Sequence, residues 1–288
     1  MTHLFPPFDP DDAPERQRVR QLRQIPIRLL LPNLLTLLAL CAGLTAIRMA
    51  LEGRFDYAVA AIVFAGILDG IDGRIARLLK STSRFGAQLD SLTDFVNFGA
   101  APAVLLFAWT LDEARSVGWM AALVFAICAA LRLARFNVAL DAPEKPEWQQ
   151  QFFVGVPAPA GAGTVLLPLY LESLGVPHSI ITTPIVIVYT IFVGLLMISR
   201  LPTWSGKAAG GRISRDAVLP IFVLVVVFAA LLVSFPWLVL SLSAIAYLAS
   251  LPFAWNAFQR LKAAENGKMA SAASVVQESG SQRQGPDA

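Results

Sequence analysis

The 288-residue chain is 56% hydrophobic and only 15% charged, with a mean hydropathy of +0.61. This composition is too apolar and too poor in charge for an ordinary soluble domain, so we predict an integral membrane protein. The formal net charge is +3, and the basic residues form no stripe with interleaved aromatic side chains, which excludes nucleic acid as an expected partner. Lysines and arginines are instead expected at the cytoplasmic ends of membrane helices.

Residues 1–27 are polar and lack the short apolar core of a cleaved signal peptide. Several arginines in this segment alternate with apolar residues. The pattern indicates either a short amphipathic stretch on the membrane surface or a disordered basic arm, and both interpretations stay open. We expect the segment to lie in the cytoplasm.

Apolar density then rises in eight blocks, each near the roughly 20 residues that a helix needs to cross the hydrocarbon core. The predicted spans cover residues 28–50, 57–80, 85–111, 116–138, 156–173, 178–199, 216–234 and 236–257. We therefore predict an all-α, polytopic bundle of about eight transmembrane helices, forming one membrane domain over residues 28–262. Residues 263–288 are rich in Ala, Ser, Gln and Gly, which predicts a disordered cytoplasmic tail.

The orientation follows from the basic residues. With the amino terminus in the cytoplasm, the connections and helix ends on that side hold Lys80, Arg84, Arg132, Arg135, Arg200, Lys207, Arg212, Arg215, Arg260 and Lys262. The opposite connections hold only Arg48, Arg54 and Arg115. The positive-inside bias thus predicts a multi-pass protein of a bacterial-type inner membrane with both termini in the cytoplasm.

Four aspartates interrupt the apolar sequence: Asp69, Asp72, Asp90 and Asp94. The first two fall on one face of a helix and the last two on one face of the next, so the four carboxylates converge if the chain turns back between these helices. Caps or loop residues on a soluble surface are the alternative. Ionisable residues within membrane spans are costly and usually functional, which favours a functional site. The orientation predicted from the basic residues makes this site open toward the cytoplasm.

Converged carboxylates in a low-dielectric setting would repel one another, so a stable cluster implies divalent cations between them. The set consists of oxygen ligands, without Cys or His. Mg²⁺, Mn²⁺ and Ca²⁺ suit such ligands better than zinc does.

The spacing of these residues resembles the signature of a known family. The pattern D-x-x-D-G-x-x-A-R-x8-G-x3-D-x3-D is complete from Asp69 through Arg77 and Gly86 to Asp94, and it is similar to that of the CDP-alcohol phosphatidyltransferases. The resemblance implies a membrane fold that binds two divalent cations, Mg²⁺ or Mn²⁺, together with a CDP-lipid. It also implies transfer of the phosphatidyl group to a hydroxyl, with release of CMP.

The same resemblance implies roles for individual residues. The metal ligands would be Asp69, Asp72, Asp90 and Asp94, with Asp94 also acting as the catalytic base toward the acceptor hydroxyl. The CDP-lipid would contact Asn33, Thr36, Gly73, Ala76, Arg77 and Gly86. Small residues leave room for the nucleotide, and the forked donors of Arg77 suit its diphosphate. For Asn33 and Thr36, hydrogen bonds between helices are an equal alternative.

The signature is shared by enzymes with different acceptors. Three further stretches, F-G-A-A-P-A from Phe98, L-R-L-A-R-F-N from Leu131 and G-V-P-A-P-A from Gly155, resemble the phosphatidylserine synthase branch. This resemblance implies CDP-diacylglycerol as donor and L-serine as acceptor, with choline or glycerol 3-phosphate as the nearest alternatives. An intramembrane metal or proton transporter is the alternative from another class, since aspartates within spans also mark ion pathways.

A serine carboxylate needs a cationic partner, for which the chain offers two basic pairs. Arg132 and Arg135 lie three residues apart at the end of the fourth predicted span, and Arg200 and Lys207 follow the sixth. Arg132 and Arg135 are equally well explained as anchors that reach lipid phosphates. Membrane lipids are expected partners, and a homodimer stays open.

Overall fold

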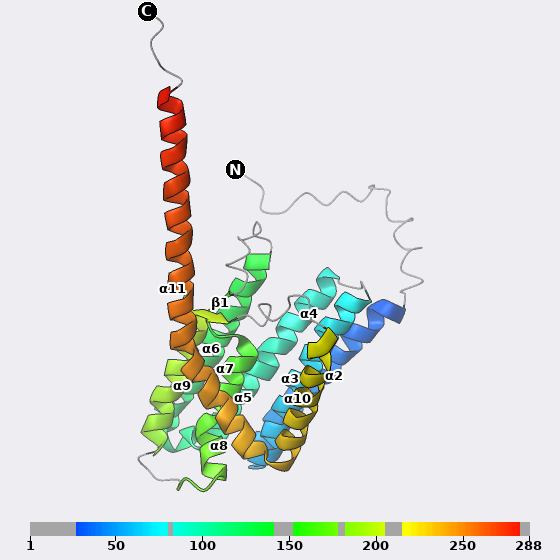
Figure 1. Cartoon of the computed structure of the whole chain (residues 1–288). Helices are drawn as coiled ribbons and strands as arrows, with labels where there is room; N and C mark the ends of the chain where they lie inside the picture. Colours follow the sequence, from blue (N-terminus) through cyan, green and yellow to red (C-terminus); the bar gives the residue numbers. More distant parts are fainter. Residues whose placement is uncertain (1–26, 80–82, 141–151, 178–181, 205–214, 283–288) are drawn as a thin grey trace, which may run out of the picture.

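The computed structural model describes residues 27–79, 83–140, 152–177, 182–204 and 215–282. Their helices stand side by side in a bundle (Figure 1). In chain order they are α2 (Ile27–Leu51), α3 (Phe55–Leu78), α4 (Arg84–Phe95), the π-helical turn η1 (Val96–Ala100), α5 (Ala101–Trp109), the 3-10 turn η2 (Leu111–Ala114), α6 (Arg115–Leu140), α7 (Ala158–Val165), α8 (Leu167–Ser173), α9 (Thr182–Ile198), α10 (Arg215–Ser234) and α11 (Pro236–Gln282). The predicted basic arm lies outside the described residues except for Ile27.

Each predicted span contains helix, which confirms the helical class. In the described part of the chain, four helical stretches are long and apolar enough to cross a membrane: Leu31–Leu51, Phe85–Trp109, Leu111–Ala139 and Pro236–Ala263. The apolar parts of α9 and α10 are shorter, and α3 carries several charged residues. The count of about eight spans therefore stays a prediction.

Helix α4 passes into α5 through a widened turn. In η1, the backbone N–H groups bond to the carbonyl five residues earlier instead of four, so that Ala101 N donates to Val96 O. Pro102 follows immediately; it has no N–H to donate to Phe98 O, and its ring crowds the preceding turn. Because η1 begins two residues after Asp94, the change of helical pitch falls directly beside the aspartates.

Helix α2 packs along α3, and α6 packs along α9. Small residues allow the close approach of α2: a Cβ added at Gly43 would lie 1.9 Å from Asn97 Oδ1 in η1. Buried alanines on α2 and α3, among them Ala39, Ala46 and Ala58, also favour close packing. Small residues at helix contacts are typical of bundles in membranes, where close backbone packing replaces the hydrophobic driving force.

A two-stranded antiparallel sheet corrects the all-α expectation. Strand β1 (Phe152–Val154) pairs with β2 (Pro202–Trp204), with Phe152 opposite Trp204 and their ring centroids 5.2 Å apart. Each strand has three residues, which is too short for the period-2 pattern that would reveal it in the sequence. The sheet joins the segment before α7 to the segment after α9, at the end of the bundle where α4 begins (Figure 1).

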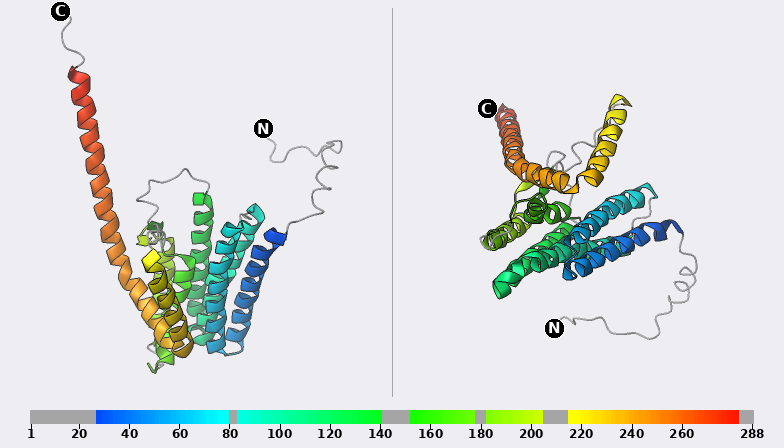
Figure 2. Two further views of the ribbon diagram at one scale, coloured as in Figure 1. Left: turned by 45° about the vertical axis from the view of Figure 1, so that its right-hand side comes forward. Right: turned by 90° about the horizontal axis from the view of Figure 1, so that it is seen from below.

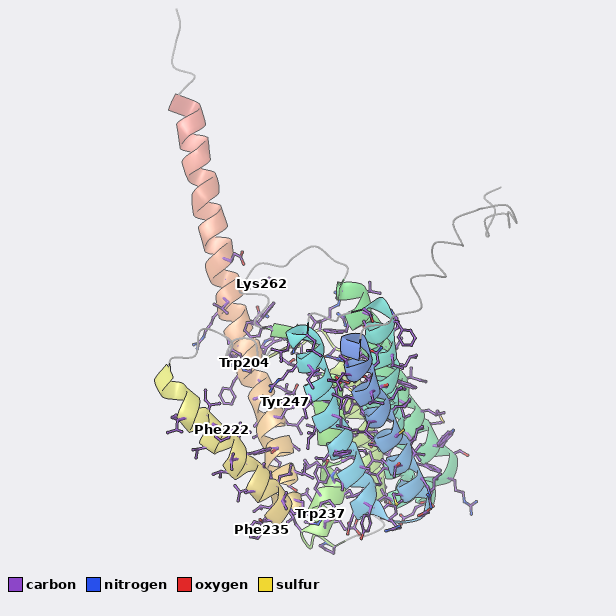
Figure 3. The ribbon with its side chains drawn as sticks, turned by 90° about the vertical axis from the view of Figure 1, so that its right-hand side faces the viewer. Trp204, Phe222, Phe235, Trp237, Tyr247 and Lys262 are labelled. Atoms are coloured by element: carbon purple, nitrogen blue, oxygen red, sulfur yellow. The ribbon has the colours of Figure 1, made fainter. Side chains whose placement is uncertain are left out.

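Helices α10 and α11 lie together on one side of the bundle (Figure 2). Helix α11 runs to Gln282 and extends well beyond the other helices, so the structure has helix where the sequence predicted a disordered tail. The Ala, Lys, Glu, Met and Gln residues of this segment favour helix and explain the difference. Trp237 and Lys262 lie near the two ends of its apolar part (Figure 3), positions typical of membrane-interface anchors.

Candidate active site

The structure brings the signature aspartates together. Asp69 and Asp72 on α3 and Asp90 on α4 each offer a carboxylate oxygen, and these oxygens lie within 4.8 Å of one another. Asp94, one turn further along α4, lies beside Asp69 and Asp90. The two helix faces meet, as their spacing predicts.

The start of α4 sets the register of Asp90 and Asp94. Ser83 has extended backbone and caps the helix, since its Oγ accepts a hydrogen bond of 2.9 Å from Gly86 N. A serine cap satisfies one of the free N–H groups of the first turn. Helix α4 therefore begins at Arg84, and the next two turns carry the aspartates toward α3.

Helix α2 supplies two polar side chains to the same region. Thr36 is buried, and its Oγ1 donates to Asp72 Oδ2 at 2.7 Å, with Pro32 O as a second acceptor at 3.0 Å. The threonine thereby holds one carboxylate of the cluster in place. Asn33 faces the start of α4: a Cβ added at Gly86 would lie 3.0 Å from Asn33 Oδ1, so Gly86 permits the close approach of these helices.

The donor set of the cluster fits hard divalent cations. Its ligand atoms are carboxylate oxygens, and no His or Cys from the described residues joins them. Asp94 Oδ1 is buried and meets no hydrogen-bond donor in the described part of the chain. Because several carboxylates this close repel one another unless positive charge lies between them, a hard divalent cation fits this site.

One side of the cluster borders an open helix face. Gly70 and Gly73 on α3 are exposed, and a Cβ added at either would meet nothing within 4 Å. Arg77 is exposed on the next turn. Ala76 belongs to the same helix, but its side chain falls outside the described residues. The bare backbone beside the carboxylates leaves room for a large ligand.

The two arginines of α6 occupy different environments. Arg132 is buried, its Nε donates to Val156 O at 2.9 Å, and its guanidinium lies within electrostatic reach of Asp94. Arg135 is exposed, and its Nη1 donates to Ile198 O at 3.0 Å, at the end of α9. The last carbonyls of a helix lack intrahelical partners and carry partial negative charge, so Arg135 stabilises this helix end.

In the second basic pair, the described residue Arg200 does not contact the aspartates. Arg200 is exposed directly after α9, and no ion pair or hydrogen bond between described residues joins it to the cluster. Lys207 lies outside the described residues. Of the three predicted acceptor residues that the structure describes, Arg132 is the one within electrostatic reach of Asp94.

The structure also identifies residues that the sequence analysis missed. Asn137 Nδ2 donates to Ser91 Oγ at 2.9 Å and thereby ties the end of α6 to α4, between the two aspartates. Its place in the L-R-L-A-R-F-N stretch was a usable signal. Tyr247 of α11 lies within electrostatic reach of Arg132, and nothing in the sequence around it indicated this position.

Comparison with known proteins agrees with the geometry. A family model described as CDP-alcohol phosphatidyltransferase matches residues 29–197, and a model described as CDP-alcohol phosphatidyltransferase 2 matches residues 216–252. A Mycobacterium leprae protein is 41% identical over 237 residues, which cover 82% of this chain and 78% of the relative.

Two further relatives carry the same name as the first, CDP-diacylglycerol–serine O-phosphatidyltransferase. The Mycobacterium tuberculosis protein is 39% identical over 225 residues, 78% of each chain. The Helicobacter pylori protein is 32% identical over 202 residues, 70% of this chain and 81% of the relative. With a family model covering more than half of its length and relatives at these identities, the chain belongs to the CDP-alcohol phosphatidyltransferase family.

Proposed function

We propose that this protein transfers the phosphatidyl group of CDP-diacylglycerol to the hydroxyl of L-serine, giving phosphatidylserine and CMP. The observation that carries the proposal is the convergence of Asp69, Asp72 and Asp90, with Asp94 beside them, in a chain whose relatives are named for this reaction. In the transfer, the serine oxygen forms a bond to the phosphatidyl phosphorus and the bond from that phosphorus to the CMP oxygen breaks. The hydroxyl proton passes to Asp94.

The carboxylates have two tasks in this reaction. Asp69, Asp72 and Asp90 would hold two divalent cations, Mg²⁺ or Mn²⁺, and Asp94 would complete the second site. When bound, such cations neutralise the diphosphate oxygens and stabilise the leaving CMP. Thr36 keeps the Asp72 carboxylate oriented through its 2.7 Å hydrogen bond. Asp94, whose Oδ1 has no donor among the described residues, is available to the acceptor proton.

The CDP-lipid lies along the open face of α3. Gly73 and Ala76 let the nucleotide approach the helix backbone, and Arg77 directs its forked donors to the diphosphate. Asn33 and Gly86 form the opposite wall, where α2 meets the start of α4. The exposure of Gly73 and Arg77 supports this arrangement, since both are free to meet a ligand.

The acceptor carboxylate binds Arg132. The hydroxyl and carboxylate of serine are separated by two carbons, so a base and a cation that serve both groups must lie close together. Arg132 is buried and lies within electrostatic reach of Asp94, whereas Arg135 holds the end of α9. Arg200, exposed after α9, is left as a contact to the lipid surface.

We place the site on the cytoplasmic face of a multi-pass protein. The helices α3, α6 and α9 end at the same end of the bundle (Figure 1), and the exposed Arg77, Arg135 and Arg200 lie near these helix ends. Positive charge marks the cytoplasmic side. In a variant without native cysteines, a membrane-impermeant maleimide should label a Gln88→Cys substitution in inside-out vesicles but not in intact cells. Labelling in intact cells would show that the site faces the opposite side of the membrane.

Acceptor choice is tested directly with the purified protein in lipid vesicles. CMP release from CDP-diacylglycerol is measured with Mg²⁺ or Mn²⁺ and with L-serine, choline or glycerol 3-phosphate as acceptor. We expect release with serine, accompanied by phosphatidylserine. Release with choline or glycerol 3-phosphate in place of serine would assign the protein to a sister activity, and the absence of release with all three would overturn the proposal.

A further inference from the structure

Helix α11 brings a tyrosine within electrostatic reach of the buried arginine of α6. Tyr247 Oη is buried; Thr203 Oγ1 of β2 is the described side-chain group beside it, but the two do not meet in hydrogen-bond geometry, and no other described atom does. Tyr247 and Arg132 lie within electrostatic reach of each other, and Arg132 is in turn within reach of Asp94. Buried polar groups are nearly always hydrogen-bonded, so an unpaired hydroxyl at this position indicates a missing partner.

The protein groups nearest to this hydroxyl have other partners. Thr203 on β2, beside Tyr247, donates its hydroxyl proton to Gly155 O at 2.9 Å. Arg132 Nε donates to Val156 O, the carbonyl that follows Gly155 O in the chain. Arg132 makes no other hydrogen bond with described residues. The turn before α7 therefore fixes Thr203 and Arg132, while the terminal nitrogens of Arg132 and the hydroxyl of Tyr247 remain available as donors.

We propose that Tyr247 and Arg132 together bind the carboxylate of the amino-acid acceptor, so that helix α11 contributes to acceptor specificity. This inference rests on the proposed function and adds a residue to its acceptor site. A carboxylate has two oxygens, and it accepts bonds from a guanidinium and from a hydroxyl at the same time. The acceptor hydroxyl then lies on the side of Asp94, while choline, without a carboxylate, leaves both donors unpaired.

A purely structural role for Tyr247 makes different predictions. If its hydroxyl only fastens α11 to β2 through Thr203, loss of the hydroxyl lowers stability and changes the use of both substrates alike. If the hydroxyl binds the carboxylate, the loss appears in the KM for serine alone. The effect on KM, set against kcat and thermal stability, therefore separates the two roles.

The test compares Tyr247→Phe with Tyr189→Phe in the full-length protein in lipid vesicles. Tyr189 on α9 is a matched control, because its hydroxyl is paired with Thr164 O at 2.6 Å and no electrostatic interaction joins it to Arg132. We expect Tyr247→Phe to raise the KM for L-serine about ten- to hundredfold, the loss expected for a hydrogen bond to a charged group. Its KM for CDP-diacylglycerol and its melting temperature should stay near those of the wild type, whereas Tyr189→Phe should lower only the melting temperature.

L-serinamide, used as a competitor, identifies the group that Tyr247 contacts. The wild type should bind serine more tightly than serinamide, and Tyr247→Phe should lose most of that preference. A wild-type serine KM in Tyr247→Phe, or equal weakening of serine and serinamide, would overturn the inference. Failure of the proposed function is distinguishable, because the unmodified protein would then release no CMP with serine.

Discussion

The carboxylate cluster and the acceptor end of the proposed site are assembled from different parts of the chain. Asp69, Asp72 and Asp90 come from two helices that follow each other in the sequence. The acceptor end combines Arg132 of α6, the turn before α7 and Tyr247 of α11. A site built from neighbouring helices leaves a fixed spacing in the sequence, whereas one built from distant elements does not.

The two parts of the site also differ in how far residue type and spacing identify their members. The aspartates share one requirement, an anionic oxygen at a given place, and their helical spacing alone supplies it. Arg132 and Arg135 share the same residue type on the same helix, yet one is buried beside Asp94 and the other caps α9. Residue type and spacing therefore identify the cluster but cannot separate two arginines three positions apart.

The largest effect is expected from the cluster itself. Replacing Asp69, Asp72 or Asp90 by Asn should lower metal-dependent CMP release by about a thousandfold or more, because several kcal/mol of charge stabilisation are lost. Asp56→Asn is the control, since Asp56 is exposed at the other end of α3 and should leave turnover unchanged. Near-normal turnover of an Asn variant of the cluster at saturating Mg²⁺ or Mn²⁺ would count against a shared metal site.

The acceptor end is tested by separating the two arginines. Arg132→Gln should raise the KM for serine about ten- to hundredfold, which corresponds to about 1.5–3 kcal/mol of lost charge-assisted hydrogen bonding. The KM for CDP-diacylglycerol should change little. Arg135→Gln should leave the serine KM in place and lower the melting temperature through the end of α9. If neither variant changes the serine KM, the search for the carboxylate partner moves to Arg200 and Lys207.

A smaller effect on metal affinity is expected from the hydrogen bond between α2 and the cluster. Thr36→Val removes the hydrogen bond to Asp72 Oδ2, and we expect the apparent affinity for Mg²⁺ in the activity assay to fall about tenfold. Thr45→Val on the same helix removes a bond to Cys41 O and should not change the metal dependence. Equal metal titrations for both variants would show that Thr36 serves only helix packing.

The smallest effect is expected from a change that keeps the charge. Arg77→Lys should raise the KM for CDP-diacylglycerol several-fold and leave the serine KM nearly constant, because Lys cannot supply the planar fork of Arg. Arg74→Lys, also exposed on α3, is the matched control and should behave like the wild type. Equal changes for both substrates in Arg77→Lys would contradict its assignment to the diphosphate.

The amino-acid sequence by itself determined the helical class, the positions of the helices and the convergence of the aspartates. These features depend on apolar blocks and on helical spacing, which are local properties of the chain. The short strands β1 and β2, the wide turn η1 after Asp94 and the helix that replaces the predicted tail were not evident in the sequence. Pairing between distant segments decides the strands, and a proline acting on the preceding turn decides η1. The helix in the tail follows instead from the helix propensity of its residues, which the sequence prediction underweighted.

The roles of polar residues outside the signature were decided by tertiary structure. Thr36 meets Asp72, Asn137 meets Ser91, and Arg132 turns inward while Arg135 does not. Each outcome depends on which helix lies opposite, and composition and periodicity carry no such information. Tyr247 is the clearest case, because its sequence context is an ordinary apolar span. Only the packing of α11 against the bundle brings its hydroxyl within electrostatic reach of Arg132. A contact between distant segments is a property of the folded chain as a whole, so the local sequence does not reveal it.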